Sequence, residues 1–339
     1  MTYAPPVSAG RTVRPAVWLG WLSVPTLVLA AALGLRTEGA WLYAPFIVSI
    51  VLFGLPHGAV DHLVLLRLDG SPLRLRPLVR VLAVYLAPGL AYLAFWFVAP
   101  VAAFVFFIAM TWFHWGQGDV HSLLVLTGGR HLRARWQRGL ALVVRGGMPM
   151  LVPLLAFPET YLGVAQSVVG AILGDGAVAS SVSPAVRLGA GAGFGLLVAL
   201  HLAAGWAAST PATRRDWIVD AAETVMLAVF FATVHPLLAV GVYFCLWHAV
   251  RHLVRIALTA SEAPPPVRVS GTGYLAHGVV MTVLALGLLA GLYLLVPVTP
   301  DSVGDLVGLY LLLISTLTLP HVWVVVRMDA EEGVFRRGG

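Results

Sequence analysis

Four short segments of the sequence place histidines inside apolar stretches, where an ionisable side chain is costly. These segments are GLPHGAVDH at 54–62, FHWGQGD at 113–119, YFCLWHAVRH at 243–252 and LPH at 319–321. In hydrocarbon, such a group costs several kcal/mol unless it is paired, hydrated or bound to an ion. Neutral imidazole is a good ligand for Fe, Cu, Zn and Ni. We therefore expect a single metal site formed by His57, His114, His248 and His252.

The last two of these histidines have a spacing that suits a shared ion. His248 and His252 are four residues apart, so on a regular helix both rings project from one face. Charged side chains nearby can hold the second ring nitrogen of a ligating histidine, or they can pair with one another. The candidates for these two roles are Asp61, Asp119, Glu223 and Arg251. His321, which follows Pro320, is a possible additional ligand.

Aromatic side chains surround the same histidines, and they are either ordinary packing residues or the walls of an apolar binding site. They are Trp112, Trp115, Tyr243, Phe244 and Trp247. The other histidines are expected to form hydrogen bonds between packed helices rather than to bind metal; they are His62, His121, His131, His201, His235 and His277. The single Cys245 excludes a disulfide within the chain and a metal site of several cysteines.

The composition predicts that membrane-spanning helices position these residues. Hydrophobic residues make up 59% of the 339 residues and charged residues only 11%, which is too little polar surface for a soluble domain. A span needs about 20 apolar residues. Such runs fall near 16–35, 42–66, 78–99, 101–126, 138–156, 184–206, 217–234, 237–258, 274–297 and 304–327. We expect an all-α, polytopic transmembrane bundle of about ten spans, with 158–183 as a re-entrant or interfacial segment.

The arginines give an independent test of this count. They fall mostly before the first run, after the even-numbered runs and at the end of the chain, whereas the opposite loops hold only Arg36 and Arg187. The positive-inside rule then makes the arginine-rich face cytoplasmic and puts both termini on that side. The arginines are spread over many loops instead of forming one basic patch, so no nucleic acid partner is expected. The protein is predicted to be a multi-pass protein of the cell membrane.

The depth of the histidines supports one common site. All four histidine-bearing runs are even-numbered and therefore run toward the cytoplasmic face. His57, His114 and His248 lie about nine to twelve residues before the ends of their runs, and His252 about six. At roughly 1.5 Å per helical residue, their side chains reach one layer in the cytoplasmic half of the membrane.

In this order, GLPHGAVDH, FHWGQGD, YFCLWHAVRH and LPH resemble the motifs of the Brp/Blh family of membrane-bound β-carotene 15,15′-dioxygenases. The linkers between the apolar runs are short and no soluble domain is apparent, so we expect one integral membrane domain over 1–339. The resemblance covers about 54–329 and implies 1–40 as an additional N-terminal helix and 41–329 as the catalytic bundle. It implies cleavage of β-carotene by O2 into two molecules of all-trans-retinal. It also implies a non-haem Fe(2+) centre at His57, His114, His248 and His252, and a retinal-binding opsin as a possible consumer of the product.

Three other functions remain compatible with buried histidines. A transporter with a His, Asp, Glu and Arg ion relay would place these charges near the midplane within an inverted repeat, which is not apparent in the sequence. A haem protein would use histidines on facing helices as axial ligands and would show a Soret band. A membrane di-iron oxygenase usually needs more histidine boxes than the single HxxxH pair at 248–252.

Overall fold

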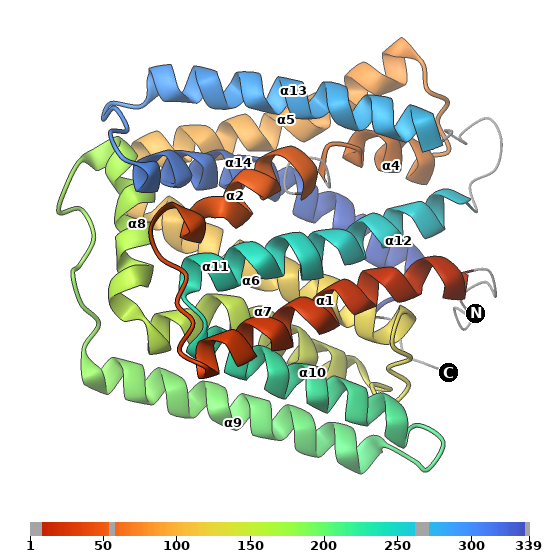
Figure 1. Cartoon of the computed structure of the whole chain (residues 1–339). Coiled ribbons are helices and arrows are strands. Elements are labelled where there is room, and N and C mark those ends of the chain that lie inside the picture. Colours follow the sequence, from red (N-terminus) through yellow and green to blue (C-terminus); the bar gives the residue numbers. More distant parts are fainter. Residues whose placement is uncertain (1–8, 54–57, 262–270, 336–339) are drawn as a thin grey trace.

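The computed structural model describes residues 9–53, 58–261 and 271–335, and this part of the chain is helical, with no strand. Long apolar segments favour helices because a helix satisfies its backbone hydrogen bonds internally. Most of the helices lie side by side along one direction and form an antiparallel bundle (Figure 1).

The described elements follow one another with short connections. They are α1 (Ala9–Ala32), η1 (Gly39–Tyr43), α2 (Ala44–Val48), η2 (Ser49–Phe53), α4 (Asp61–Leu68), α5 (Leu75–Val98), α6 (Pro100–Val125), α7 (Arg135–Ala156), α8 (Pro158–Leu173), α9 (Pro184–Ala208), α10 (Arg214–Thr233), α11 (Pro236–Val242), η3 (Tyr243–Ala249), α12 (Val250–Ser261), α13 (Gly271–Leu295) and α14 (Val303–Glu332). Several helices begin with a proline, whose fixed φ and missing N–H suit the first helical turn.

The helices coincide with the apolar runs of the sequence, but they differ in how apolar they are. Within the described residues, six helices are long and apolar enough to cross a membrane: 75–98, 135–156, 184–208, 236–259, 275–295 and 303–332. α6 is as long as these, yet it carries His114, Gln117 and Asp119 near its middle. α10 is also less apolar, because Asp216, Asp220 and Glu223 are among its buried residues.

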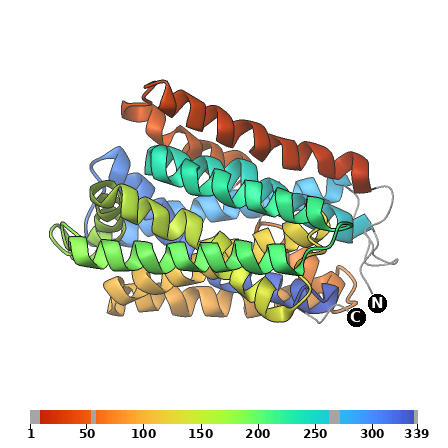
Figure 2. The same cartoon turned by 90° about the horizontal axis from the view of Figure 1, so that it is seen from below.

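Two expected spans are not regular helices. The run at 42–66 is divided into η1, α2, η2 and α4, and His57 lies outside the described residues. The run at 237–258 continues through α11 and α12, but its middle, η3, is π-helical. α8 covers most of the segment expected to be interfacial, and Figures 1 and 2 show it lying across the bundle at the end away from the start of α1.

The two ends of the described chain lie at the same end of the bundle. α1 begins and α14 finishes there (Figures 1 and 2). The connections α4–α5, α6–α7 and α9–α10 turn at this end as well (Figure 1). These connections and the adjoining helix ends carry many of the arginines of the sequence. Arginine-rich connections therefore gather at the end where α14 stops.

α6 and α7 approach each other closely because glycines face the partner backbone. A Cβ at Gly116 would clash with the carbonyl oxygen of Leu142, and one at Gly146 would clash with that of Trp112. Small residues at such contacts let membrane helices pack backbone to backbone. This contact brings Arg145 of α7 next to Asp119 of α6, with 3.7 Å between Arg145 Nε and Asp119 Oδ2.

Candidate metal centre and adjoining cavity

Four buried histidines from different parts of the chain converge inside the bundle. His114 comes from α6, His248 from η3, His252 from α12 and His321 from α14. The Nε2 atoms of His114 and His248 are 3.1 Å apart. The ring of His321 is 4.7 Å from that of His114 and 5.1 Å from that of His252, measured between centroids. The structure thus places three of the histidines expected in the site together, along with His321.

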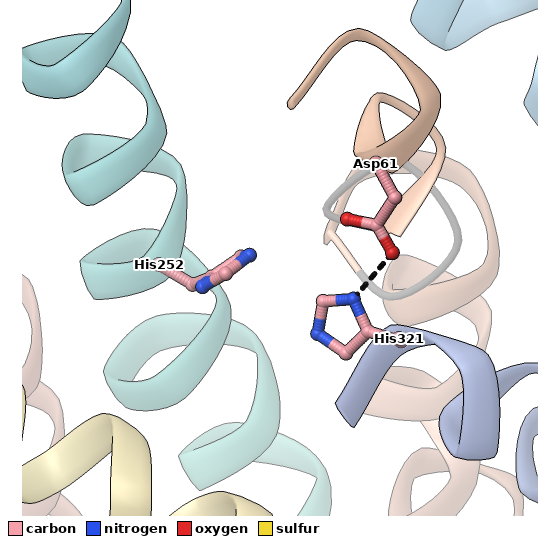
Figure 3. Close-up of side chains that lie close together, drawn as sticks. All are labelled: Asp61, His252 and His321. Carbon is pink, nitrogen blue, oxygen red and sulfur yellow. Dashed lines mark hydrogen bonds and ion pairs between the residues drawn. The ribbon is translucent and has the colours of Figure 1, made fainter. Parts of the chain in front are cut away.

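Asp61, at the start of α4, orients one ring of this cluster. Its Oδ2 atom is 2.7 Å from Nδ1 of His321, and both side chains are buried. Figure 3 shows His252 facing this pair from the opposite helix. Asp61, His252 and His321 each offer a ligand atom, and these atoms lie within 4.8 Å of one another. Asp61 is also near His57 in sequence, but His57 is outside the described residues.

The π-helical turn η3 determines how His248 is presented. The rings of His248 and His252 are nearly parallel, with an interplanar angle of 3° and centroids 6.5 Å apart. A Cβ at Gly118 would lie 3.1 Å from Cε1 of His248, so this glycine lets the ring approach α6. π-Helical turns are uncommon and often occur at functional sites. The four-residue spacing alone does not indicate this turn.

The donor set fits a transition-metal ion. Ligand atoms on opposite sides of such an ion are about 4 Å apart, since each metal–nitrogen bond is about 2.0–2.1 Å. One ligand atom each of Asp61, His252 and His321 lies within 4.8 Å of the others, which is close to the separation of atoms on opposite sides of one ion. A carboxylate on Nδ1 of His321 leaves Nε2 as the ligand atom, as in many metal sites. Imidazole nitrogens suit iron, copper, zinc and nickel.

A second buried cluster, which we call the ion network, lies beside the histidines and consists of Asp119, Arg145, Glu223 and Arg251. Arg145 is fully buried and pairs with Glu223, and Arg251 Nη2 is 2.8 Å from Oε1 of the same carboxylate. Asp119 Oδ1 accepts a hydrogen bond of 2.9 Å from Nε1 of Trp247, the residue before His248. The guanidinium of Arg251 stacks 3.7 Å above the Trp247 ring. The expected supporting acids Asp119 and Glu223 therefore pair with arginines.

Arg145 is the member of this network that the motifs did not indicate. It is a single arginine within an apolar run, and its three acidic neighbours come from α6 and α10. Its isolation in that run is the one sequence signal that marks it. Two carboxylates and two guanidinium groups balance within the network, which is how buried charges are usually accommodated.

α1 completes the ion network from outside. The Trp21 indole Nε1 donates a 2.7 Å hydrogen bond to Oε1 of Glu223. A Cβ at Gly20 would lie 2.6 Å from Cε3 of Trp247, so α1 and η3 are in direct contact. The first helix is therefore packed against the residues that support His248.

Several histidines expected to serve in helix packing have partners elsewhere. His131 and His201 both contact Oδ2 of Asp220, at 3.0 and 3.1 Å, and the other pairs are His62 with His277 and His121 with Glu332, each at 3.0 Å. His235 is half-buried at the start of α11. These contacts account for the first five as hydrogen-bonding residues between packed elements, whereas Nδ1 of His235 has no partner among the described residues.

A mainly apolar cavity of about 340 Å³ reaches the histidine cluster. Asp61, His114 and His321 line its polar end, and the remaining wall is formed largely by aliphatic and aromatic side chains. The cavity follows α6 from Phe104 to Trp115 and α14 from Tyr310 to His321. Each of these segments advances eleven residues (115 − 104 and 321 − 310), which corresponds to about 16 Å of helix.

Of the five aromatic residues expected at a substrate site, Trp115 and Phe244 line this cavity. Their rings stack with an interplanar angle of 19°. Trp112, Tyr243 and Trp247 lie behind the wall instead. Trp112 packs edge-on against Phe194, while Tyr243 and Trp247 are fully buried and stack on each other.

Known proteins resemble this chain over most of its length. A family model described as beta-carotene 15,15′-dioxygenase matches residues 48–329. The probable beta-carotene 15,15′-dioxygenase Blh of Halobacterium salinarum is 43% identical over 340 residues, covering 96% of this chain and 96% of that protein. The probable beta-carotene 15,15′-dioxygenase Brp of the same organism is 34% identical and covers 86% of this chain and 84% of its own. No solved structure matches the chain.

Proposed function

Because the chain belongs to the beta-carotene 15,15′-dioxygenase family, we propose that it cleaves the central double bond of β-carotene with O2. The 15,15′ double bond breaks, one O2 molecule is consumed, and each of the two carbons gains one oxygen atom as the aldehyde of a retinal molecule. One observation carries the proposal: buried histidines from four elements converge at the end of an apolar cavity.

The proposed cofactor is a ferrous ion held by His114, His248, His252 and His57, the last of which lies outside the described residues. His321 faces the same cluster and is available as a further ligand, since Asp61 holds its Nδ1 atom. Iron bound there supplies the redox chemistry that lets dioxygen react with an alkene. The fit of the donor atoms supports a metal, and the family supports iron as the metal.

The protein contributes shape, orientation and exclusion of water. A polyene has no polar groups to hold, so it is fixed by the surfaces of an apolar pocket. An extended C40 polyene is about as long as the hydrocarbon core of a membrane is thick, roughly 30 Å. The cavity length along α6 and α14 therefore matches about half of the substrate, which would place the central bond at the histidines. Trp115 and Phe244 form the wall next to His114 and His248.

We propose that the enzyme lies in the cell membrane with about ten spans and both termini in the cytoplasm. The six long apolar helices support a membrane protein. The common end of α1 and α14, together with the arginine-rich connections there, supports the orientation through the positive-inside rule. Residues 41–329 would form the catalytic bundle, to which residues 1–40 add one helix.

Expression in a bacterium that accumulates β-carotene tests the function. The expected result is loss of carotenoid colour and formation of retinal, measured after extraction. His248→Ala should abolish both retinal formation and bound iron, whereas His235→Ala should leave both, because His235 is half-buried at the start of α11 and lines no part of the cavity. Well-expressed, iron-loaded protein that forms no retinal would refute the proposed function.

A further inference from the structure

Thr111 presents an unused hydroxyl next to the histidine cluster. It lies on α6 three residues before His114, so the two side chains share one face of the helix. It is buried, with 6% of its surface exposed, and it lines the cavity. Its Oγ1 atom has no hydrogen-bond partner in the part of the chain that the structure describes. We propose that the Thr111 hydroxyl binds an oxygen atom of a reactant or product in this cavity.

Most threonines in the described helices bond their hydroxyl, whereas those of Thr111 and Thr282 have no partner in the described part of the chain. Such residues commonly donate to the carbonyl oxygen three or four positions earlier. Thr318 does so to Ile314 at 2.7 Å, and Thr233 does so to Val229 at 2.8 Å. A buried polar atom without a partner is destabilising and needs an explanation, and a bound ligand is one.

Two other hydroxyls that line the cavity are already engaged. Thr318 donates to Ile314, and Tyr85 donates to the carbonyl oxygen of Leu317 at 3.4 Å. Both acceptors are backbone carbonyl oxygens of α14, so these two hydroxyls already have hydrogen-bond partners within the protein. Thr111 is therefore the hydroxyl near His114 that retains its donor for a molecule inside the cavity.

The chemistry of the reaction limits what can accept this hydrogen bond. The inference rests on the proposed function, in which the hydrocarbon substrate has no acceptor atom. Oxygen enters as O2 and leaves in the two aldehydes, so the acceptor is either dioxygen before cleavage or the aldehyde oxygen of retinal after it. Each offers an oxygen atom that can accept a hydrogen bond, and each must lie near the cluster. Thr111 is thus a group that positions oxygen, and it is distinct from the ligands of the ion.

Purified, iron-loaded enzyme with Thr111→Val tests this role, because valine keeps the shape and removes the hydroxyl. Loss of one hydrogen bond should change the affected constant roughly 2- to 10-fold. A rise in KM for O2 identifies dioxygen as the acceptor, and weaker inhibition by added retinal identifies the aldehyde. Thr111→Ser should restore the wild-type value. The matched control is Thr233→Val, which removes a helical hydroxyl that is bonded to Val229 and lies outside the cavity.

A second readout does not depend on turnover. Nitric oxide can be titrated into the ferrous protein as a probe for dioxygen and followed by electron paramagnetic resonance. Weaker binding in Thr111→Val, with unchanged iron content and thermal stability, supports the dioxygen role. If that variant loses stability, Thr111→Ala serves as the second hydroxyl-free variant.

The inference is overturned if wild-type enzyme forms retinal and the hydroxyl-free variants match it in KM for O2, retinal inhibition and nitric oxide binding. Wild-type enzyme that forms no retinal instead contradicts the proposed function.

Discussion

Asp61→Asn is the sharpest test of the way the histidine cluster is held. The carboxylate lies 2.7 Å from Nδ1 of His321 and is buried, so water cannot take its place. Asparagine has nearly the same shape and can still accept a hydrogen bond, but it removes the negative charge. Replacing such a supporting carboxylate typically lowers metal affinity about 10- to 100-fold. We therefore expect a loss of about 1.4–2.8 kcal/mol in iron binding free energy.

The assay is competition for ferrous iron between the purified protein and a chelator of known affinity, with total iron measured in parallel. Asp69→Asn is the matched control, because Asp69 caps the other end of α4 and its partner is Arg327, at 2.9 Å. This control should retain wild-type affinity. Equal affinity of Asp61→Asn and wild type would show that His321 and its carboxylate do not belong to the metal site.

The remaining predictions concern the ion network, the cavity and the metal itself. Arg145→Leu should lower the free energy of unfolding by about 3–5 kcal/mol, because it leaves buried acids without a partner; denaturation in detergent measures this. Trp21→Phe should lower it by about 1–3 kcal/mol through loss of the bond to a carboxylate, while Trp18→Phe, at an exposed neighbouring position, should change it little. Phe244→Ala should raise KM for β-carotene more than Trp112→Ala does in a steady-state assay, since only the former residue lines the cavity. Removal of iron by a chelator should lower Tm, and ferrous iron should restore it, because the ion binds the folded state.

The sequence alone predicts the helices of the bundle and most members of the histidine cluster. Apolar runs of span length mark helices because of the thickness of the membrane, and histidines within them stand out against that background. His114, His248 and His252 were found in this way, and the structure brings them together. Their roles as iron ligands remain a prediction.

The sequence alone does not predict which face of a helix meets the cavity, or which charged residues from distant helices pair with each other. The face of α6 that lines the cavity carries Thr111, His114 and Trp115, and Trp112 lies beyond its edge. Arg145 meets acids on α6 and α10, and no local pattern connects them. The sequence also does not indicate the π-helical turn before His252, because its apolar residues are equally suited to a regular helix.

The contact between Trp21 and Glu223 shows that the packed bundle extends beyond the residues that the family model matches. The family model begins at residue 48, whereas α1 ends at Ala32, yet α1 shields a carboxylate that pairs with both arginines of the ion network. A shortened protein that starts at the family boundary would lose the Trp21 hydrogen bond and uncover this carboxylate. We expect such a truncation to be stable only if another apolar surface, such as a second copy of the chain, covers the gap. The part of the chain that the family model matches is therefore smaller than the set of helices that pack around Glu223.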